Sequence, residues 1–177
     1  MSQTETAGSR LTLAGELPEK GRRFPDLELT MASGRCVHLS DYRGRSNLVL
    51  VFAGHQAATA ELLSEMAKSY EQLKGQEAEI IAVAQCPKHE CGRIEQQLKL
   101  PFSVFSDEDG HIHREVGASD QLGHASAAAY VTDRYGEVFA LYRTRDGQAL
   151  PGAAEILNWL EFINIQCPEC EPPEWPA

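Results

Sequence analysis

Two pairs of closely placed cysteines are the most reactive side chains in this sequence. Cys167 and Cys170 enclose a Pro-Glu dipeptide near the C-terminus, and Cys86 and Cys91 are separated by four residues. Two sulfurs this close in sequence can form a small disulfide that exchanges electrons with a partner thiol, or can bind one metal ion together. The fifth cysteine, Cys36, lies in a predicted strand and is expected to be inert. The sequence therefore indicates Cys167 and Cys170 as the candidate catalytic dithiol.

The position of the C-terminal pair limits its reactivity. Cys167 and Cys170 follow the last predicted helix, so no helix N-terminus would lower the pKa of either thiol. Three interpretations remain open: exchange with the thiol or disulfide of a partner protein, an inert structural disulfide, and half of a zinc site completed by Cys86 and Cys91. Only the first interpretation, exchange with the thiol or disulfide of a partner protein, would make the C-terminal pair catalytic.

Cys86 and Cys91 have two interpretations of their own. They follow a predicted buried strand, and Lys88 and His89 between them would favour a thiolate. In the other interpretation Cys86 ends the strand and Cys91 begins a helix, both as small buried residues, because free buried cysteine behaves as a small hydrophobic residue. The sequence favours this packing role, with any redox role an aid to the C-terminal pair.

Length and charge limit the class of protein. The chain has 177 residues, a hydrophobic fraction of 42% and a formal net charge of −10, which together predict one globular domain. An acidic chain is poorly suited to nucleic acid or anionic membranes, and no apolar run reaches the roughly 18 residues of a membrane-spanning helix. Residues 1–10 lack the apolar core of a secretion signal, so a cytoplasmic location is expected. We expect a flexible segment at 1–15, a domain at 16–165 and a Cys/Pro-rich tail at 166–177.

A buried strand followed by an amphipathic helix organises the predicted fold. Leu48–Phe52 is a continuous apolar run, as expected for a strand buried on both faces. From Ala57 onward, apolar residues recur at the spacing of one helix face as far as Leu73. The loop that starts at Ala53 would therefore lie at the carboxyl end of the sheet, where α/β proteins place their chemistry.

The remaining apolar runs complete a predicted α/β fold. Further strands are predicted at 24–29, 35–39, 79–84, 102–105, 128–132 and 137–142, and helices at 92–98 and 151–163. The first two strands are expected to form a hairpin, and the alternation of strands and helices predicts a parallel segment. This order is that of the thioredoxin-like sandwich, a mixed central sheet with helices on both faces, an N-terminal hairpin and an extended C-terminal tail.

Several motifs occur in an order typical of one family. They are Gly21 with Phe24–Leu27, Val37–Gly44, Leu48–Phe52, Leu100–Phe102 with Phe105–Gly110, Val116–Gly117 and Tyr130–Val138. In these motifs the chain resembles the peroxiredoxin-like branch of the thioredoxin superfamily, the alkyl hydroperoxide reductase/thiol-specific antioxidant proteins. Several independent signals agree along most of the chain. The resemblance implies a thioredoxin-like fold, thiol-based reduction of oxidants and pairing into homodimers.

The chain departs from this family at the expected active site. The resemblance implies a peroxidatic cysteine in the loop or first helical turn after the buried strand, yet residues 53–61 contain no cysteine. It also implies an arginine just before a later strand, where Ala127 and Ala128 stand instead. Thr59 offers only an unactivated hydroxyl, and His55 is interpreted as a partly exposed loop residue. The sequence therefore predicts that the usual peroxidatic site is lost.

Two hypotheses for the function follow. In the first, the protein is a thiol oxidoreductase in which Cys167 and Cys170 alternate between dithiol and disulfide, acting on protein disulfides or peroxide-derived oxidants without a bound cofactor. In the second, it is an inactive thioredoxin-fold scaffold whose former active site accepts a peptide, a small ligand or a second subunit. A structural zinc ion bound by all four paired cysteines would fit this second hypothesis.

A polar turn follows the predicted strand at 102–105. Asp107, Glu108 and Asp109 lack the spacing of an EF-hand calcium loop, so a simple turn accounts for them. His111 and His113 come next, and the sequence favours solvated turn residues over metal ligands.

Overall fold

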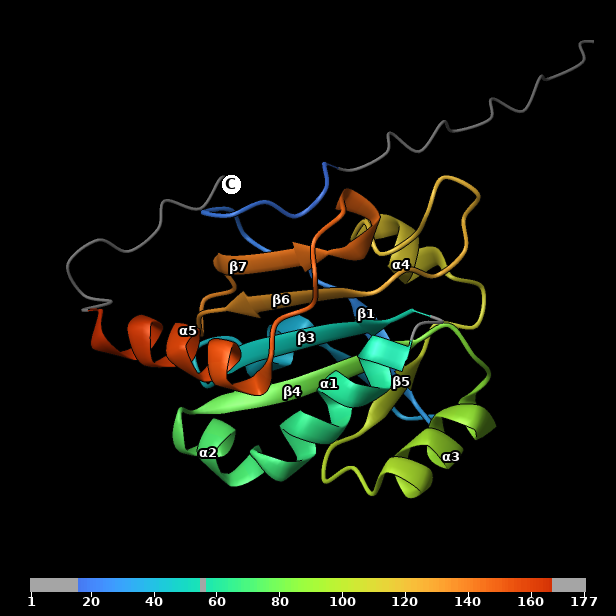
Figure 1. The fold of residues 1–177 in the computed structure, drawn as a ribbon, viewed down its shortest axis with the longest axis horizontal. Helices are drawn as coiled ribbons and strands as arrows, with labels where there is room; N and C mark the ends of the chain where they lie inside the picture. The colour runs from blue at the N-terminus through green and yellow to red at the C-terminus, as the bar shows by residue number, and fades with distance from the viewer. Residues whose placement is uncertain (1–15, 55–56, 167–177) are drawn as a thin grey trace, which may run out of the picture.

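The computed structural model describes residues 16–54 and 57–166 as a seven-stranded sheet with helices packed against it (Figure 1). The strands are β1 Glu28–Met31, β2 Cys36–His38, β3 Asn47–Ala53, β4 Ala78–Ala84, β5 Val104–Ser106, β6 Ala128–Thr132 and β7 Val138–Arg143. The helices are α1 Ala57–Lys68, α2 Tyr70–Gly75, α3 Lys88–Leu98, α4 His111–Glu115 and α5 Ala153–Ile165, with 3₁₀ turns η1 Leu39–Tyr42 and η2 Thr144–Asp146. None of the helices in these two ranges is long and apolar enough to cross a membrane. The predicted domain boundaries stay predictions.

β3 lies at the centre of the sheet. The strand order is β2-β1-β5-β4-β3-β6-β7. β3 pairs in parallel with β4 and antiparallel with β6, and β4 pairs in parallel with β5. β1 and β2 form the predicted hairpin, which joins the sheet antiparallel to β5. The predicted mixed sheet is therefore confirmed.

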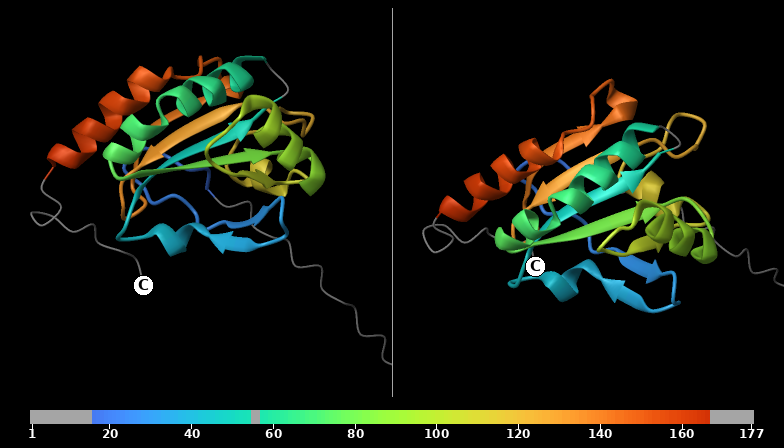
Figure 2. Two further views of the ribbon diagram at one scale, coloured as in Figure 1. Left: turned by 90° about the horizontal axis from the view of Figure 1, so that it is seen from below. Right: turned by 60° about the horizontal axis from the view of Figure 1, so that its bottom comes forward.

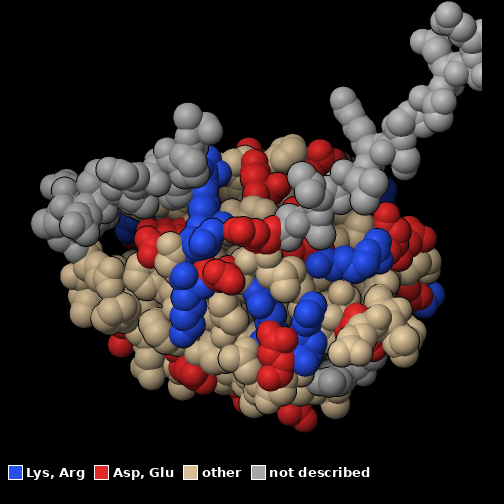
Figure 3. All heavy atoms as spheres, turned by 90° about the horizontal axis from the view of Figure 1, so that it is seen from above, with Lys and Arg blue, Asp and Glu red and all other residues tan. Residues whose placement is uncertain are grey.

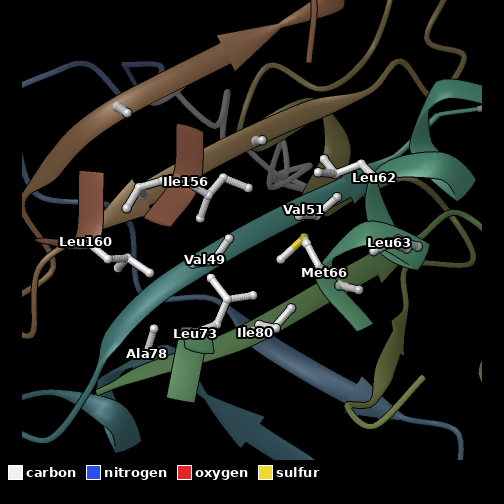
Figure 4. Close-up of a cluster of buried hydrophobic side chains, with 14 of the residues drawn as sticks. Val49, Val51, Leu62, Leu63, Met66, Leu73, Ala78, Ile80, Ile156 and Leu160 are labelled. Carbon is white, nitrogen blue, oxygen red and sulfur yellow. The ribbon is translucent and has the colours of Figure 1, made fainter. Parts of the chain in front are cut away.

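Helices cover both faces of the sheet, as predicted (Figure 2). On one face, α1, α2, α3 and α5 pack over alternate residues of β3, and Figure 4 shows Val49, Val51 and Met66 in this layer. On the other face, α4, η1 and the segment before β1 cover Leu50 and Phe52. All five side chains are fully buried, and each contributes about 1.5–3 kcal/mol by leaving water. The continuous apolar run in the sequence thus reflects a strand buried on both sides.

Two elements, β1 and α3, differ from the sequence-based prediction in their starting residue more than the others do. β1 begins at Glu28 rather than Phe24, because Pro25 has no N–H group to donate to a strand ladder. α3 begins at Lys88, earlier than predicted, with Pro87 as its N-cap. The predicted loop after β4 is therefore mostly helix, and this helix carries one of the paired cysteines.

β3, β4 and β5 end together at one edge of the sheet. The parallel register pairs Ala53, the last residue of β3, with Ala84, the last residue of β4. β5 runs parallel to β4 and brings Ser106 opposite Ala84. The loops that leave these three strands are therefore neighbours, and their side chains form the candidate site.

The surface carries charges of both signs. Acidic and basic side chains are interspersed over the face shown in Figure 3, although the chain has a formal net charge of −10. Exposed ion pairs such as Arg22 with Glu16 (2.9 Å) contribute little to stability. This face therefore presents mixed charge to a partner.

Candidate functional site

The segment after β4 brings two sulfur atoms together. Cys86 follows the strand, and Cys91 lies in the first half of α3, which begins directly after Pro87. The two Sγ atoms are 3.3 Å apart, about 1.3 Å farther than in a disulfide bond. Both are free thiols; Cys91 is fully buried and Cys86 is half-buried. A small movement would close a disulfide, and Cys86 is the sulfur that a partner can reach first.

Hydrogen bonds fix the loop that carries Cys86. Cys86 N donates to Ala84 O (2.8 Å), and Asp107 N donates to the same oxygen (2.9 Å). Ser106 Oγ donates to Cys86 O (2.6 Å). The loop is therefore held both by its own strand and by the end of β5.

Burial suppresses ionisation of both sulfurs. Burial, with a smaller contribution from the hydrogen bond to Cys86, raises the pKa of Cys91 to about 12. Burial also raises the pKa of Cys86, against the lowering effect of its hydrogen bond with Cys91. Since the thiolate is the attacking species, the dithiol reacts slowly at neutral pH. Both thiolates are also poor leaving groups, so a disulfide formed here would resist reduction.

The end of β3, one strand away, is closed by backbone packing. Gly54 lies so close to the 126–127 segment that a Cβ atom on it would stand 2.6 Å from Ala127 N. Ala127 and Ala128, the positions matched to the expected arginine, are completely buried. Thr59 is buried in α1, and its hydroxyl has no hydrogen-bond partner among the described residues. The described part of this strand end thus presents backbone and small side chains.

A buried histidine–aspartate pair contacts the end of β3. His113 Nδ1 lies 2.6 Å from Asp107 Oδ2, and His113 Nε2 lies 3.2 Å from Ala53 O. Asp107 also accepts hydrogen bonds from the backbone N–H groups of Ile112 (3.2 Å) and His113 (2.8 Å). Both ring nitrogens face acceptors; the neutral ring can donate only one of these bonds, whereas the imidazolium donates both. The pair ties the end of β3 to the connection between β5 and α4.

The sequence-based interpretation of His113 as a solvated turn residue is wrong. The residue is 1% exposed, and its ring packs edge-on against Phe52 with centroids 5.7 Å apart. The short helix α4 separates the two histidines: His111 stays exposed beside Asp109 (2.8 Å), whereas His113 turns inward. Burial opposes ionisation of Asp107, but the hydrogen bonds from the His113 side chain and the nearby backbone outweigh it and hold the pKa of this carboxyl below its ordinary value.

The other residues singled out in the sequence lie apart from this site or outside the described ranges. Cys36 lies in β2 as predicted and is exposed, with Sγ 3.6 Å from Thr30 Oγ1. Cys167, Cys170 and His55 lie outside the described residues. The C-terminal dithiol and the four-cysteine zinc site therefore stay predictions.

Sequence reasoning missed Ser106. The predicted strand at 102–105 stops one residue short of it, although Ser106 is the last residue of β5. Because β5 runs parallel to β4, its final residue has to lie near the loop after β4. A hydroxyl at the end of a parallel strand was the signal available in the sequence.

A groove lies away from the cysteines. It has a volume of about 460 Å³ and runs between α1 and the segment that joins η2 to α5. Its lining includes Ala58, Glu61 and Glu65 of α1, together with Gln148 and Leu150. None of the described residues that line it is a cysteine, so the groove is separate from Cys86 and Cys91.

Residues 20–140 match the model of the AhpC/TSA family, and this match covers more than half of the chain. The chloroplastic peroxiredoxin Q of Oryza sativa subsp. japonica is 28% identical over 143 residues, which cover 79% of this chain and 65% of the rice protein. A peroxiredoxin of Nanoarchaeum equitans is 26% identical over 158 residues, which cover 81% of this chain and 68% of that protein. The match thus spans just under two thirds of the length of the rice relative.

Solved structures share the fold. Peroxidoxin BcpB from Mycobacterium tuberculosis aligns with a TM-score of 0.71 at 17% identity, over 82% of this chain and 98% of that chain. AhpC from Enterococcus faecalis aligns with a TM-score of 0.69 at 16% identity, over 84% and 93% of the two chains. At these identities the likeness concerns the fold alone, and it confirms the predicted thioredoxin-like sandwich.

Proposed function

Because the chain belongs to the AhpC/TSA family, we propose that it is a thiol-based oxidoreductase whose reactive dithiol is Cys86 and Cys91. The observation that carries this proposal is the 3.3 Å between their Sγ atoms. The pair lies across the start of α3, where a helix N-terminus favours negative charge on Cys86, and burial raises the pKa of this thiol in the resting dithiol. This role replaces the packing role favoured by the sequence, because the early start of α3 brings the sulfurs together.

The exchange would take place in two steps. The Cys86 thiolate attacks one sulfur of a partner disulfide, so the partner's S–S bond breaks, a mixed disulfide forms and one partner thiolate leaves. The Cys91 thiolate then attacks Cys86 Sγ, closes the intramolecular disulfide and releases the second partner thiolate. The protein loses two electrons and two protons, and the partner gains them as two thiols. Cys86 acts first because it is the more exposed sulfur.

The usual peroxidatic site of the family, at the end of β3, is lost in this proposal. Residues 53–61 contain no cysteine, and the close packing of Gly54 against the 126–127 backbone leaves no room there for a large side chain. The dithiol after β4 would carry the remaining chemistry. Its proposed substrates are protein disulfides or peroxide-derived oxidants.

The other roles predicted from the sequence are kept as additional or alternative proposals. Cys167 and Cys170 form a second proposed dithiol, and all four paired cysteines together form the proposed zinc site. The groove beside α1 supports the alternative of a catalytically inactive scaffold that binds a peptide or a small ligand. A cytoplasmic location and a homodimer also stay proposals.

Disulfide mapping of the full chain tests the main proposal. The reduced protein is oxidised in a glutathione buffer, alkylated and digested, and we expect peptides cross-linked through Cys86 and Cys91. Cys86→Ser should abolish this cross-link and the reduction of insulin disulfides. The double variant Cys167→Ser/Cys170→Ser is the matched control and should retain both.

The opposite outcome would assign the function elsewhere. Exchange that survives Cys86→Ser but is lost in the double variant would place the reactive dithiol in the C-terminal pair. Stoichiometric zinc in protein purified without chelator, with all four thiols protected from alkylation, would favour the metal site. A protein without exchange activity that still binds a specific ligand would favour the scaffold.

A further inference from the structure

Ser106 contacts the peptide group of Cys86, the first cysteine of the proposed dithiol. Its register partner in β4 is Ala84, two residues before Cys86. The residue is 9% exposed, and its Oγ donates a hydrogen bond to Cys86 O over 2.6 Å. The pairing of β5 with β4 therefore delivers a buried hydroxyl to the peptide group of Cys86.

The carbonyl oxygen that accepts this bond also lies near Cys91 Sγ. Burial raises the pKa of the Cys91 thiol to about 12, and a side-chain hydrogen bond with Ser106 acts in the opposite direction. Cys91 Sγ lies 4.0 Å from Cys86 O, so the serine hydroxyl and the cysteine thiol face one carbonyl acceptor. A serine hydroxyl has a single proton and rotates to suit its partners. It can donate to the carbonyl or to the sulfur, but not to both at once.

We propose that Ser106 is a positioning residue for thiol–disulfide exchange: its hydroxyl holds the Cys86 loop in the dithiol and turns to Cys91 Sγ when that sulfur becomes the attacking thiolate. This inference rests on the proposed role of the Cys86–Cys91 dithiol. The physical reason is that the thiolate brings a full charge into a buried site, and a buried charge without a hydrogen-bond donor is costly.

The effect of Ser106 falls mainly on the second step of exchange. In the first step the half-buried Cys86 attacks, and Ser106 bonds only to its carbonyl oxygen. In the second step Cys91 must lose its proton and reach Cys86 Sγ. Removing the hydroxyl should therefore slow closure of the disulfide and shift its pH dependence, whereas a merely structural role would lower stability without such a shift.

Four variants of the full chain separate these roles. Ser106→Ala and Ser106→Val lack the hydroxyl, and Ser106→Thr retains it in the shape of valine. Ser126→Ala is the matched control, because Ser126 is also 9% exposed and its hydroxyl has no hydrogen-bond partner among the described residues. Each reduced protein is oxidised with glutathione disulfide from about pH 7 to about pH 10, around the ordinary cysteine pKa. Alkylation and mass spectrometry follow closure of the Cys86–Cys91 disulfide.

We expect the closure rate to fall by about tenfold in Ser106→Ala and Ser106→Val, the loss typical of one charge-assisted hydrogen bond. The pH at which these two variants reach a given closure rate should also move upward. Ser106→Thr and Ser126→Ala should keep the wild-type rate and pH profile.

A wild-type rate with an unshifted pH profile in the two variants without the hydroxyl would overturn the role of Ser106 and leave the proposed dithiol intact. If Ser106→Ala does not fold, the pair of equal shape, Ser106→Val and Ser106→Thr, answers the same question. If the wild-type protein forms no Cys86–Cys91 disulfide, the proposed function fails and the role of Ser106 fails with it.

Discussion

The ends of β3 and β4 lie side by side but offer different chemistry. After β3, Gly54 packs against the backbone of Ala127, and Ala53 O lies 3.2 Å from Nε2 of the buried His113. After β4, Cys86 and Cys91 hold their sulfurs 3.3 Å apart. One edge of one sheet thus has a closed end beside an end with two thiols.

The comparison shows that two loops can share the same edge of the sheet while only one of them carries cysteine side chains. Both loops lie at the carboxyl edge, where α/β proteins place reactive groups. The AhpC/TSA family membership leads one to expect a cysteine after β3, yet the close pair of sulfurs follows β4. In the proposed function, the chemistry has moved by one strand while the sheet stays the same.

The largest expected effect concerns which sulfur attacks. In Cys91→Ser the first exchange step can proceed but the second cannot, so a mixed disulfide with glutathione should accumulate on Cys86. In Cys86→Ser no adduct should form on Cys91, because Cys91 is fully buried. Peptide mapping after incubation with glutathione disulfide measures the adducts and separates them from any adduct on the exposed Cys36. An adduct on Cys91 in place of Cys86 would contradict the contrast between an accessible and a buried sulfur.

The closed end after β3 should depend on its buried histidine–aspartate pair. His113→Ala removes the buried side-chain partner of Asp107, and breaking a buried pair of this kind costs about 3–5 kcal/mol of the free energy of unfolding. His124→Ala is the control, because this histidine is exposed, pairs with Asp120 rather than Asp107, and should change stability by less than about 0.5 kcal/mol. Urea denaturation measures both. Equal losses in the two variants would show that the buried pair does not hold this strand end.

Close packing at Gly54 should give a smaller effect. A Cβ atom at this position would press on Ala127 N, so Gly54→Ala should lower the free energy of unfolding by about 1–3 kcal/mol, the usual cost of overpacking. Gly75→Ala, in α2, is the control because nothing lies within 4 Å of its would-be Cβ. Thermal or urea unfolding of both variants measures the difference. A neutral Gly54→Ala would mean that the loop after β3 can move aside.

The smallest expected effect is a pH dependence set by Asp107. Burial opposes its ionisation, but hydrogen bonds led by that from His113 hold its pKa below the ordinary value. A carboxyl with a lower pKa in the folded state stabilises the fold above its unfolded pKa, and this stabilisation is lost as the pH falls through the folded pKa. The free energy of unfolding should therefore decrease below about pH 4.

Asp107→Asn should show a smaller decrease over the same range, because it has no carboxyl to protonate at this position. Urea denaturation at a series of acidic pH values compares the two proteins. The same pH slope in both would rule out Asp107 as a source of the acid sensitivity.

The sequence predicts the sheet better than the site. A continuous apolar run at Leu48–Phe52 suits a strand buried on both faces, and β3 confirms this. The sulfur pair is harder to predict. Cys86 and Cys91 come together here because α3 starts between them, directly after Pro87. The residues around Pro87 also suit a loop, so the sequence does not fix this helix start. The burial of His113 depends on which side of α4 faces the sheet, and tertiary contacts decide that. Sequence patterns thus predict periodic burial, whereas single contacts at loop ends depend on exact helix starts.

The contact between Gly54 and Ala127 has a consequence for enzyme engineering. A designer who wished to install a peroxide-reducing centre after β3 would first think of substituting a cysteine and an arginine into the two facing segments. The main chains already touch there, since even one added carbon at Gly54 would stand 2.6 Å from a backbone nitrogen. A side chain placed at Gly54 would therefore require these two segments to move apart.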